Sequence, residues 1–214
     1  MKGIVLKVRS PKSFYSRRKD ISYFLKRYGL FTMFLLSILI GFAVGIYAGT
    51  HNGESFRQSF DFLFPTDFDA RKALDFIGLF SSNFAPMFLF FITVFFLAFC
   101  PWGNAVTPLI TAFRGFGAGL TLTQLCYQGG GRGFAFFILA VVPGFFILSA
   151  SISLQGEQSF LFSSQVFKVI IKRQNNVLNI REFVMRSGTY LFMAMLSAVV
   201  DTVLFLALYP GFNI

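Results

Sequence analysis

The sequence predicts an all-α, polytopic membrane protein: a helical bundle of about five transmembrane helices. Hydrophobic residues make up 55% of the 214 residues and charged residues only 13%, whereas a soluble domain carries about 25% charged residues. The chain also contains 33 Phe, more aromatic surface than a core of this size can keep away from water. Its mean hydropathy of +0.67 agrees. This composition is typical of a chain whose solvent is lipid.

Apolar stretches long enough to cross a bilayer occur five times. A helix needs about 20 mostly apolar residues to cross about 30 Å of hydrocarbon. The predicted spans are residues 30–49, 76–100, 105–124, 133–154 and 189–209. In the second span, the polar residues 81–83 followed by Pro86 predict a break near the start of the helix. The fifth span is closed by Pro210 and Gly211.

The basic residues predict the orientation of these spans. Residues 1–29 hold nine Lys and Arg against one acid, and residues 155–187 hold five more. With five spans these two segments lie on the same side, which the positive-inside rule assigns to the cytoplasm. The connection of residues 50–72 carries four acids and three basic residues, so we expect it outside. The predicted topology has the N-terminus inside and the C-terminus outside.

Three segments outside the spans carry predictions of their own. Residues 1–29 form a basic arm that we expect to lie on the anionic lipids of the inner leaflet, while residues 30–214 form the membrane domain. Within that domain, residues 163–186 place apolar side chains at spacings of three and four, which predicts a cytoplasmic amphipathic helix or helical pair. The outer connection places Phe60, Phe62 and Phe64 beside acids, which predicts a docking surface.

The sequence offers little that could support catalysis. Its one histidine, His51, lies at the outer end of the first span, and no zinc-protease, nucleophile-elbow, P-loop or dinucleotide motif occurs. Cys100 and Cys126 have no metal-ligand spacing and are expected to be small apolar fillers. We therefore expect no enzyme activity, no metal and no cofactor. With the basic residues assigned to the membrane surface, we expect no nucleic-acid partner.

Two ionisable residues lie at predicted membrane depth, Arg114 in the third span and Asp201 in the fifth. A charge there costs at least about 2.5 to 3.5 kcal/mol. Opposite charges at comparable depth predict an interhelical ion pair, which lowers the cost of both. An ion or proton pathway is the alternative. Such a pathway needs polar residues in series, and only Thr121, Thr123 and Gln124 are near in the sequence.

Small residues and a proline shape the third and fourth spans. Gly115, Gly117 and Gly119 form a face of small residues that lets another helix approach closely. That helix belongs to the same chain, to a second copy or to a partner, and the sequence leaves these alternatives open. Pro143 and Gly144 predict a kink or break in the fourth span, and the backbone groups freed there need partners inside the protein.

The block from Trp102 to Leu148 resembles the stage II sporulation protein M family. It contains a basic residue (Arg114) followed by spaced glycines, then a glycine-rich turn, then a helix with a proline (Pro143). Members of the family have this length, a basic N-terminal arm and about five spans. The resemblance implies a non-enzymatic scaffold that anchors and localises peptidoglycan-remodelling hydrolases during engulfment in endospore formation.

The family's partners are a lytic transglycosylase and an amidase-type cell-wall hydrolase. The resemblance also implies a location in the bacterial cell membrane, at the septal or engulfing membrane. An alternative function is a channel or transporter subunit of the bacterial inner membrane, which Arg114, Asp201 and the broken helices favour. Whether the chain forms an oligomer stays open at this point.

Overall fold

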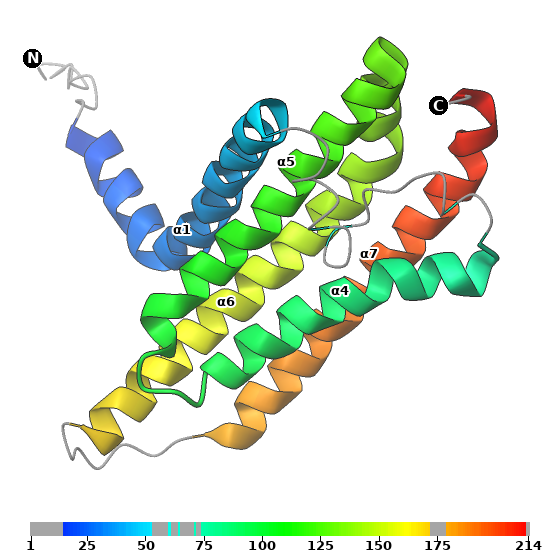
Figure 1. Cartoon of the computed structure of the whole chain (residues 1–214). Coiled ribbons are helices and arrows are strands. Elements are labelled where there is room, and N and C mark those ends of the chain that lie inside the picture. Colours follow the sequence, from blue (N-terminus) through cyan, green and yellow to red (C-terminus); the bar gives the residue numbers. More distant parts are fainter. Residues whose placement is uncertain are drawn as a thin grey trace, which may run out of the picture.

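Long helices that run side by side make up the described part of the chain (Figure 1). The computed structural model describes residues 15–52, 60, 64, 71, 74–171 and 179–212, with side chains from residue 29 onward. All elements in this part of the chain are helical. They are α1 (Tyr15–His51), α4 (Phe76–Leu97), α5 (Gly103–Phe136), the π-helix η1 (Phe137–Val141), α6 (Val142–Ile170) and α7 (Ile180–Phe212).

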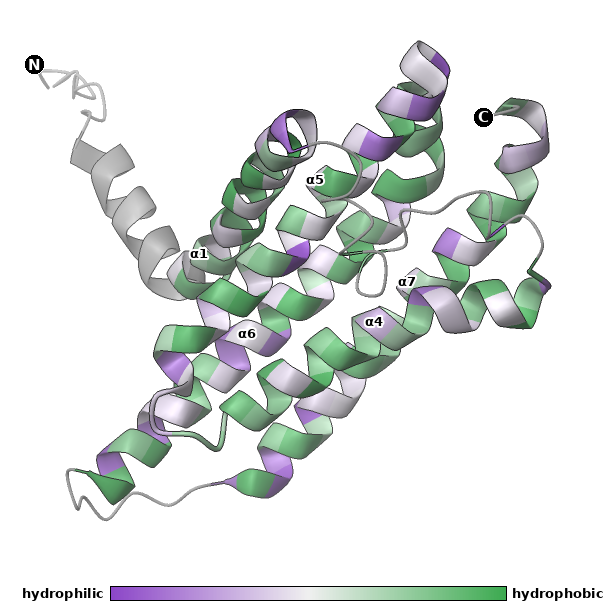
Figure 2. Ribbon diagram, viewed as in Figure 1, coloured by the Kyte–Doolittle hydropathy of each residue, from purple (hydrophilic) through white to green (hydrophobic). Residues whose placement is uncertain are grey.

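Within the described residues, four helices are long and apolar enough to cross a membrane. They are Gly29–His51, Phe76–Leu97, Gly103–Ile170 and Ile180–Phe212. Figure 2 shows that apolar residues cover most of the length of these helices. The predicted all-α, multi-pass membrane protein is therefore confirmed at this level.

The longest of the four helices doubles back on itself. Its 68 residues would extend about 100 Å if straight, far more than a bilayer needs. At Gly130 the backbone leaves helical geometry, with φ 54° and ψ −127°, a conformation that glycine adopts without steric cost. Beyond the turn, a Cβ on Gly133 would lie 1.8 Å from the carbonyl oxygen of Leu125. The two limbs therefore form a tight hairpin, visible in Figure 1 as α5 and α6 running in opposite directions.

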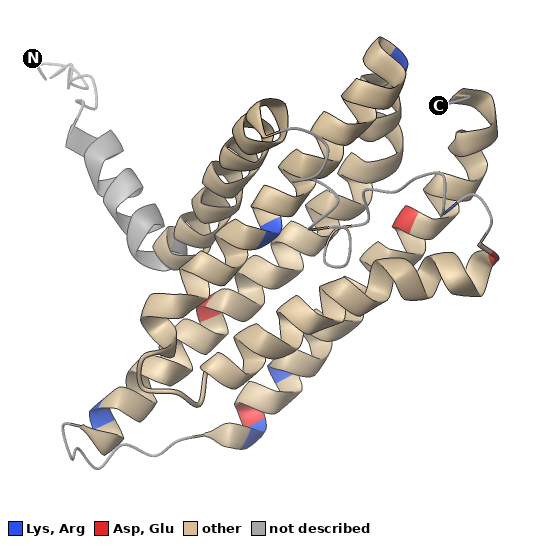
Figure 3. Ribbon diagram, viewed as in Figure 1, with Lys and Arg blue, Asp and Glu red and all other residues tan. Residues whose placement is uncertain are grey.

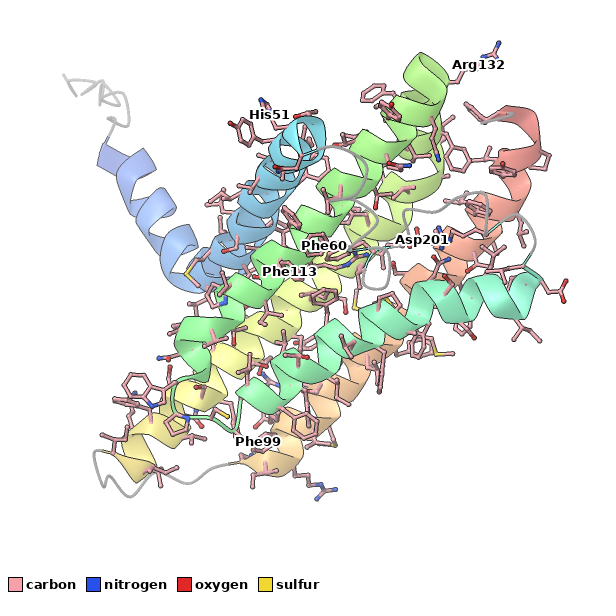
Figure 4. The ribbon with its side chains drawn as sticks, viewed as in Figure 1. His51, Phe60, Phe99, Phe113, Arg132 and Asp201 are labelled. Carbon is pink, nitrogen blue, oxygen red and sulfur yellow. The ribbon has the colours of Figure 1, made fainter. Side chains whose placement is uncertain are left out.

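The helix ends gather in two groups (Figure 1). The C-terminal ends of α1 and α7 lie at the same end of the bundle as the turn at Gly130. The α4–α5 turn and the facing ends of α6 and α7 lie at the opposite end. Figure 4 places His51 and Arg132 in the first group and Phe99 in the second.

Glycines bring α1 and α5 into backbone contact. At four of them a Cβ would lie 1.8 to 2.3 Å from a carbonyl oxygen of the opposite helix. The contacts are Gly41 with Ala112, Gly45 with Phe116, Gly115 with Ile38, and Gly119 with Phe42. Such small residues allow close helix packing in a membrane. The helix that covers the predicted glycine face is thus α1 of the same chain.

Two predicted features of the helices differ in the structure. The break predicted near Pro86 does not occur: α4 runs from Phe76 to Leu97 with Pro86 inside it. The separate amphipathic helix predicted for residues 163–186 is also absent from the described part of that segment. Its first residues continue α6 and its last begin α7, while residues 172–178 lie outside the described ranges.

Of the apolar residues that suggested a surface helix, Val166 and Phe183 are buried between helices, whereas four others stay exposed: Ile170, Ile171, Ile180 and Val184. Phe162 of α6 stacks on Phe183 of α7, with ring centroids 4.6 Å apart. Phe95 of α4 stacks on the same ring at 5.3 Å. A spacing of three and four identifies an apolar face, and here only part of that face meets neighbouring helices.

Candidate functional site

A cavity of about 70 Å³ inside the bundle is lined by three charged side chains. Its described polar lining consists of Arg71, Asn83, Arg114, Thr121 and Asp201. These residues come from the outer connection, α4, α5 and α7, and η1 closes one side. Figure 3 shows how few charged residues the described helices carry away from their ends. The cavity is therefore the main polar feature at this depth.

Arg114 and Asp201 face the cavity from α5 and α7 without direct contact. The described part of the chain holds no ion pair between them within 4.0 Å. Their charges do interact electrostatically. The Nε atom of Arg114 and the Oδ1 atom of Asp201 are both buried without a hydrogen-bond partner among the described residues. The predicted pair is thus an interaction across a cavity rather than a contact ion pair.

Arg71 is a functional candidate that the sequence did not single out. It belongs to the outer connection, yet its side chain is buried in the bundle. Its Nη2 donates a hydrogen bond to Oδ1 of Asn83, and its guanidinium carbon lies 5.3 Å from the ring centroid of Phe205. Asn83 in turn donates to the Thr202 hydroxyl at 3.1 Å. Arg71 therefore ties the connection to α4 and α7.

Phe64 is a second anchor of the same connection. Its side chain is 0% exposed and lies against Gly117, where a Cβ would come within 2.0 Å of the ring. It stacks on Phe90 with centroids 5.7 Å apart, and the Arg114 guanidinium lies 6.0 Å from its centroid, within reach of a cation–π contact. Gly117 thus makes room for Phe64 rather than for a helix.

The prediction of an outer docking surface needs correction at these residues. Phe64 is buried because an aromatic ring finds more apolar contact in the bundle than at the surface. Phe60 is half-buried against Phe113 and Phe116, with centroids 6.2 and 5.7 Å away. Phe62 lies outside the described residues.

The helix around Pro143 changes its winding rather than breaking. The π-helix η1 ends at Val141, directly before the start of α6. Carbonyls in a π-helix pair five residues ahead instead of four, so this register can pass over the missing N–H of Pro143. One residue after the proline, the carbonyl oxygen of Gly144 accepts a 2.7 Å hydrogen bond from the Ser197 hydroxyl, which ties α6 to α7.

Gly144 also sets the position of the cavity's carboxylate. A Cβ at this glycine would lie 1.8 Å from Oδ1 of Asp201. The backbone of α6 and the carboxylate on α7 are therefore in contact. No larger residue fits at position 144 while Asp201 stays where it is.

Hydroxyl groups on α6 are a further feature that the sequence did not single out. Five serines of this helix are buried: Ser149, Ser151, Ser153, Ser159 and Ser163. The Ser151 hydroxyl donates to the carbonyl of Tyr190 at 2.6 Å, and that of Ser163 donates to the carbonyl of Cys100 at 2.7 Å. Small hydroxyl residues allow close packing and hydrogen bonding between membrane helices. Their concentration in residues 149–163 is the signal that could have revealed this interface.

The structure brings together some of the predicted site residues and leaves others apart. Arg114 and Asp201 line one cavity, and Gly144 contacts the carboxylate of Asp201. His51 is exposed at the end of α1, where it stacks on Tyr47. The described ranges contain no group of three or more His, Cys, Asp or Glu residues that could hold a metal. No family model, curated protein or solved structure matches this chain.

Proposed function

We propose that the chain is a non-enzymatic membrane scaffold that anchors and localises peptidoglycan-remodelling hydrolases during engulfment in endospore formation. Its partners in this proposal are a lytic transglycosylase and an amidase-type cell-wall hydrolase. The resemblance of residues 102–148 to the stage II sporulation protein M family supports the proposal. One of the residues that carry the resemblance, Arg114, lines the cavity described above.

The proposed topology has five spans, with the N-terminus in the cytoplasm and the C-terminus outside. The hairpin at Gly130 supports it, because the turn divides the long helix into two limbs that each suffice to cross a bilayer. The grouping of helix ends supports it as well, since the ends assigned to one side lie together (Figure 1). Of the 19 basic residues, 14 fall in the segments assigned to the cytoplasm.

The observation that carries the scaffold proposal is the anchoring of the outer connection. Phe60, Phe64 and Arg71 attach it to the bundle at three points, through aromatic contacts and a buried guanidinium. A scaffold has to hold its external segment in a fixed place so that a partner meets a defined surface. Because Phe64 is buried, we assign docking to the acids of this connection instead. They are Glu54, Asp61, Asp67 and Asp69.

Copurification of the hydrolases with the tagged full-length chain tests the proposal. We expect both hydrolases to copurify with the wild-type protein from sporulating cells. Replacing the four acids of the connection with their amides should lower that recovery at least about tenfold, since charge complementarity guides docking. The matched control replaces the exposed Glu182, at the opposite end of the bundle, with Gln. Equal recovery of the hydrolases with the wild-type protein, the variant with four amides and the Glu182 control would contradict the proposal.

The cavity favours a second candidate, a channel or transporter subunit. Charged groups at membrane depth mark ion pathways in many transporters, and Arg114 and Asp201 are such groups. Against this, the hydroxyls of Thr121 and Thr123 donate to carbonyls of their own helix, at 3.1 and 2.9 Å. Proteoliposome flux assays separate the candidates. Ion or proton flux above that of empty liposomes, abolished by Asp201→Asn, would favour the channel over the scaffold.

A further inference from the structure

An apolar groove lies between α4 and α7, toward the end of the bundle that holds the α4–α5 turn (Figure 1). It has a volume of about 270 Å³ and is lined by four residues between Phe88 and Phe95 and four between Val184 and Leu191. The polar residue of this lining is Ser187, whose hydroxyl oxygen is buried. Each helix rises about 10 Å along the groove, which is most of the roughly 15 Å of hydrocarbon in one leaflet. The groove therefore offers the bilayer an apolar surface that an acyl chain can follow.

The shape of the groove suits a flexible chain better than another helix. Gly188 keeps it open, since a Cβ at this glycine would meet nothing within 4 Å. Close helix packing in a membrane uses small residues repeated at a spacing of four, as in the contact of α1 with α5. The residues four positions from Gly188 are Val184 and Phe192, and both are large. The α4 side of the groove consists of Phe and Ile residues alone.

A positive charge lies on the same side of α7 as the groove. Arg181 precedes Val184 by three residues and Gly188 by seven, so helical periodicity places it on their face, toward the start of α7. It is exposed and forms no ion pair with a described residue. Its long side chain can therefore reach a group at the level of the lipid headgroups.

The surroundings of Arg181 are positively charged as well. Residues 163–186 hold five Lys and Arg against one acid, Glu182, which forms an ion pair with Arg186. Residues 172–178, outside the described ranges, contain two basic residues and no acid. Residues 1–29 add nine basic residues and one acid to the chain. Charge complementarity thus favours an anionic headgroup at this end of the groove.

We propose that the groove between α4 and α7 binds one acyl chain of an anionic phospholipid, whose phosphate is held by the Arg181 guanidinium. A guanidinium binds phosphate oxygens through strong, charge-assisted hydrogen bonds. The apolar lining selects the chain and Arg181 selects the charge, so the two parts of the site can be tested separately. The site rests on the location of these helices in a membrane and is independent of the scaffold role.

Thermal unfolding of the purified full-length protein, freed of lipid in detergent, tests the site with phosphatidylglycerol as the probe. Phosphatidylcholine with the same chains is the comparison, because its choline group offsets the charge of the phosphate. We expect the unfolding midpoint to rise with phosphatidylglycerol and to saturate, because a ligand that binds only the folded state stabilises it. Half-saturation should need at least about fivefold more phosphatidylcholine. Equal responses to the two lipids would overturn the proposal.

The variant Arg181→Gln tests the phosphate contact. It should raise the half-saturating concentration of phosphatidylglycerol about fivefold, toward that of phosphatidylcholine. Arg132→Gln is the matched control, since Arg132 is also exposed but lies at the opposite end of the bundle, and it should bind like the wild-type protein. A wild-type response in Arg181→Gln would overturn the assignment of the phosphate.

The variant Gly188→Leu tests the acyl chain. Its side chain can enter the groove, because a Cβ there meets nothing within 4 Å, so the midpoint without lipid should stay unchanged. The half-saturating concentration of phosphatidylglycerol should rise at least about fivefold, because the chain loses apolar contact area. Gly131→Leu, at an equally open position, is the control. Unchanged binding in Gly188→Leu, or a wild-type dimer that Gly188→Leu dissociates, would overturn the lipid as the occupant.

Discussion

Single glycines determine where two buried side chains of the bundle lie. Gly117 leaves room for the ring of Phe64, and Gly144 leaves room for the carboxylate of Asp201. At both positions the nearest group is a side chain that the fold needs in place, so an added methyl group forces that side chain to move. Gly130 differs from them, because there the backbone conformation rather than the space requires glycine.

Replacing Gly117 with Ala should destabilise the protein by about 1 to 3 kcal/mol, the usual cost of overpacking a filled core. The added Cβ would lie 2.0 Å from Cδ1 of Phe64, so the ring and the connection that carries it have to shift. The unfolding midpoint of the purified protein measures the effect. Gly131→Ala is the matched control, since a Cβ there meets nothing within 4 Å. Equal midpoints for the two variants would refute the anchoring of Phe64.

The contact between Gly144 and Asp201 predicts a strong coupling between two substitutions. Gly144→Ala alone should destabilise the protein, because its Cβ would lie 1.8 Å from the carboxylate. Asp201→Ala removes that carboxylate and makes room, so the double variant should be more stable than the sum of the single effects by about 1 to 3 kcal/mol. A double-mutant cycle on unfolding free energies measures the coupling. Additive effects would mean that the two residues do not touch.

At the scale of whole elements, the pairing of α1 with α5 dominates the architecture. The glycines on α5 could be recognised from the sequence as a packing face, but their partner could not. Gly41 and Gly45 on α1 repeat the same spacing of four, which is the signal that could have identified it. Spacing alone does not specify which two small-residue faces meet, because many faces of this kind are compatible in lipid.

Gly45→Leu should separate α1 from α5 and destabilise the protein by at least about 3 kcal/mol, since the backbone of Phe116 occupies the space that the side chain needs. The amount of the variant in the membrane and its unfolding midpoint both measure this destabilisation. Gly188→Leu serves as the control, because nothing lies within 4 Å of a Cβ at that position. Normal accumulation of the Gly45 variant would show that these helices do not pack as described.

The sequence predicted the membrane helices well and the connections poorly, for a physical reason. Long apolar stretches define α1, α4 and α7 because crossing lipid demands them. The burial of Phe64 and Arg71 could not be predicted, because hydropathy does not say whether a residue outside a span folds back into the bundle. The same limit applies to residues 163–186. Their apolar periodicity is real, but periodicity does not identify the surface that covers it.

At the scale of the whole molecule, the proposed orientation in the membrane rests on charge and on the grouping of helix ends. Single cysteines introduced at Arg132 and Asn179 test it, after replacement of Cys100 and Cys126. Both positions are exposed and belong to opposite ends of the bundle. We expect an impermeant thiol reagent to label position 132 in intact cells and position 179 only after permeabilisation. The reverse pattern would invert the proposed topology.

In the scaffold role that we propose, a helical bundle fixes an acidic outer connection, and that connection recruits the hydrolases. Imaging a fluorescently tagged hydrolase in sporulating cells that lack this protein tests that claim most directly. The account predicts that the hydrolase loses its position at the engulfing membrane and that engulfment stalls, with both restored by the wild-type gene. Normal recruitment and normal engulfment in the deletion strain would contradict it.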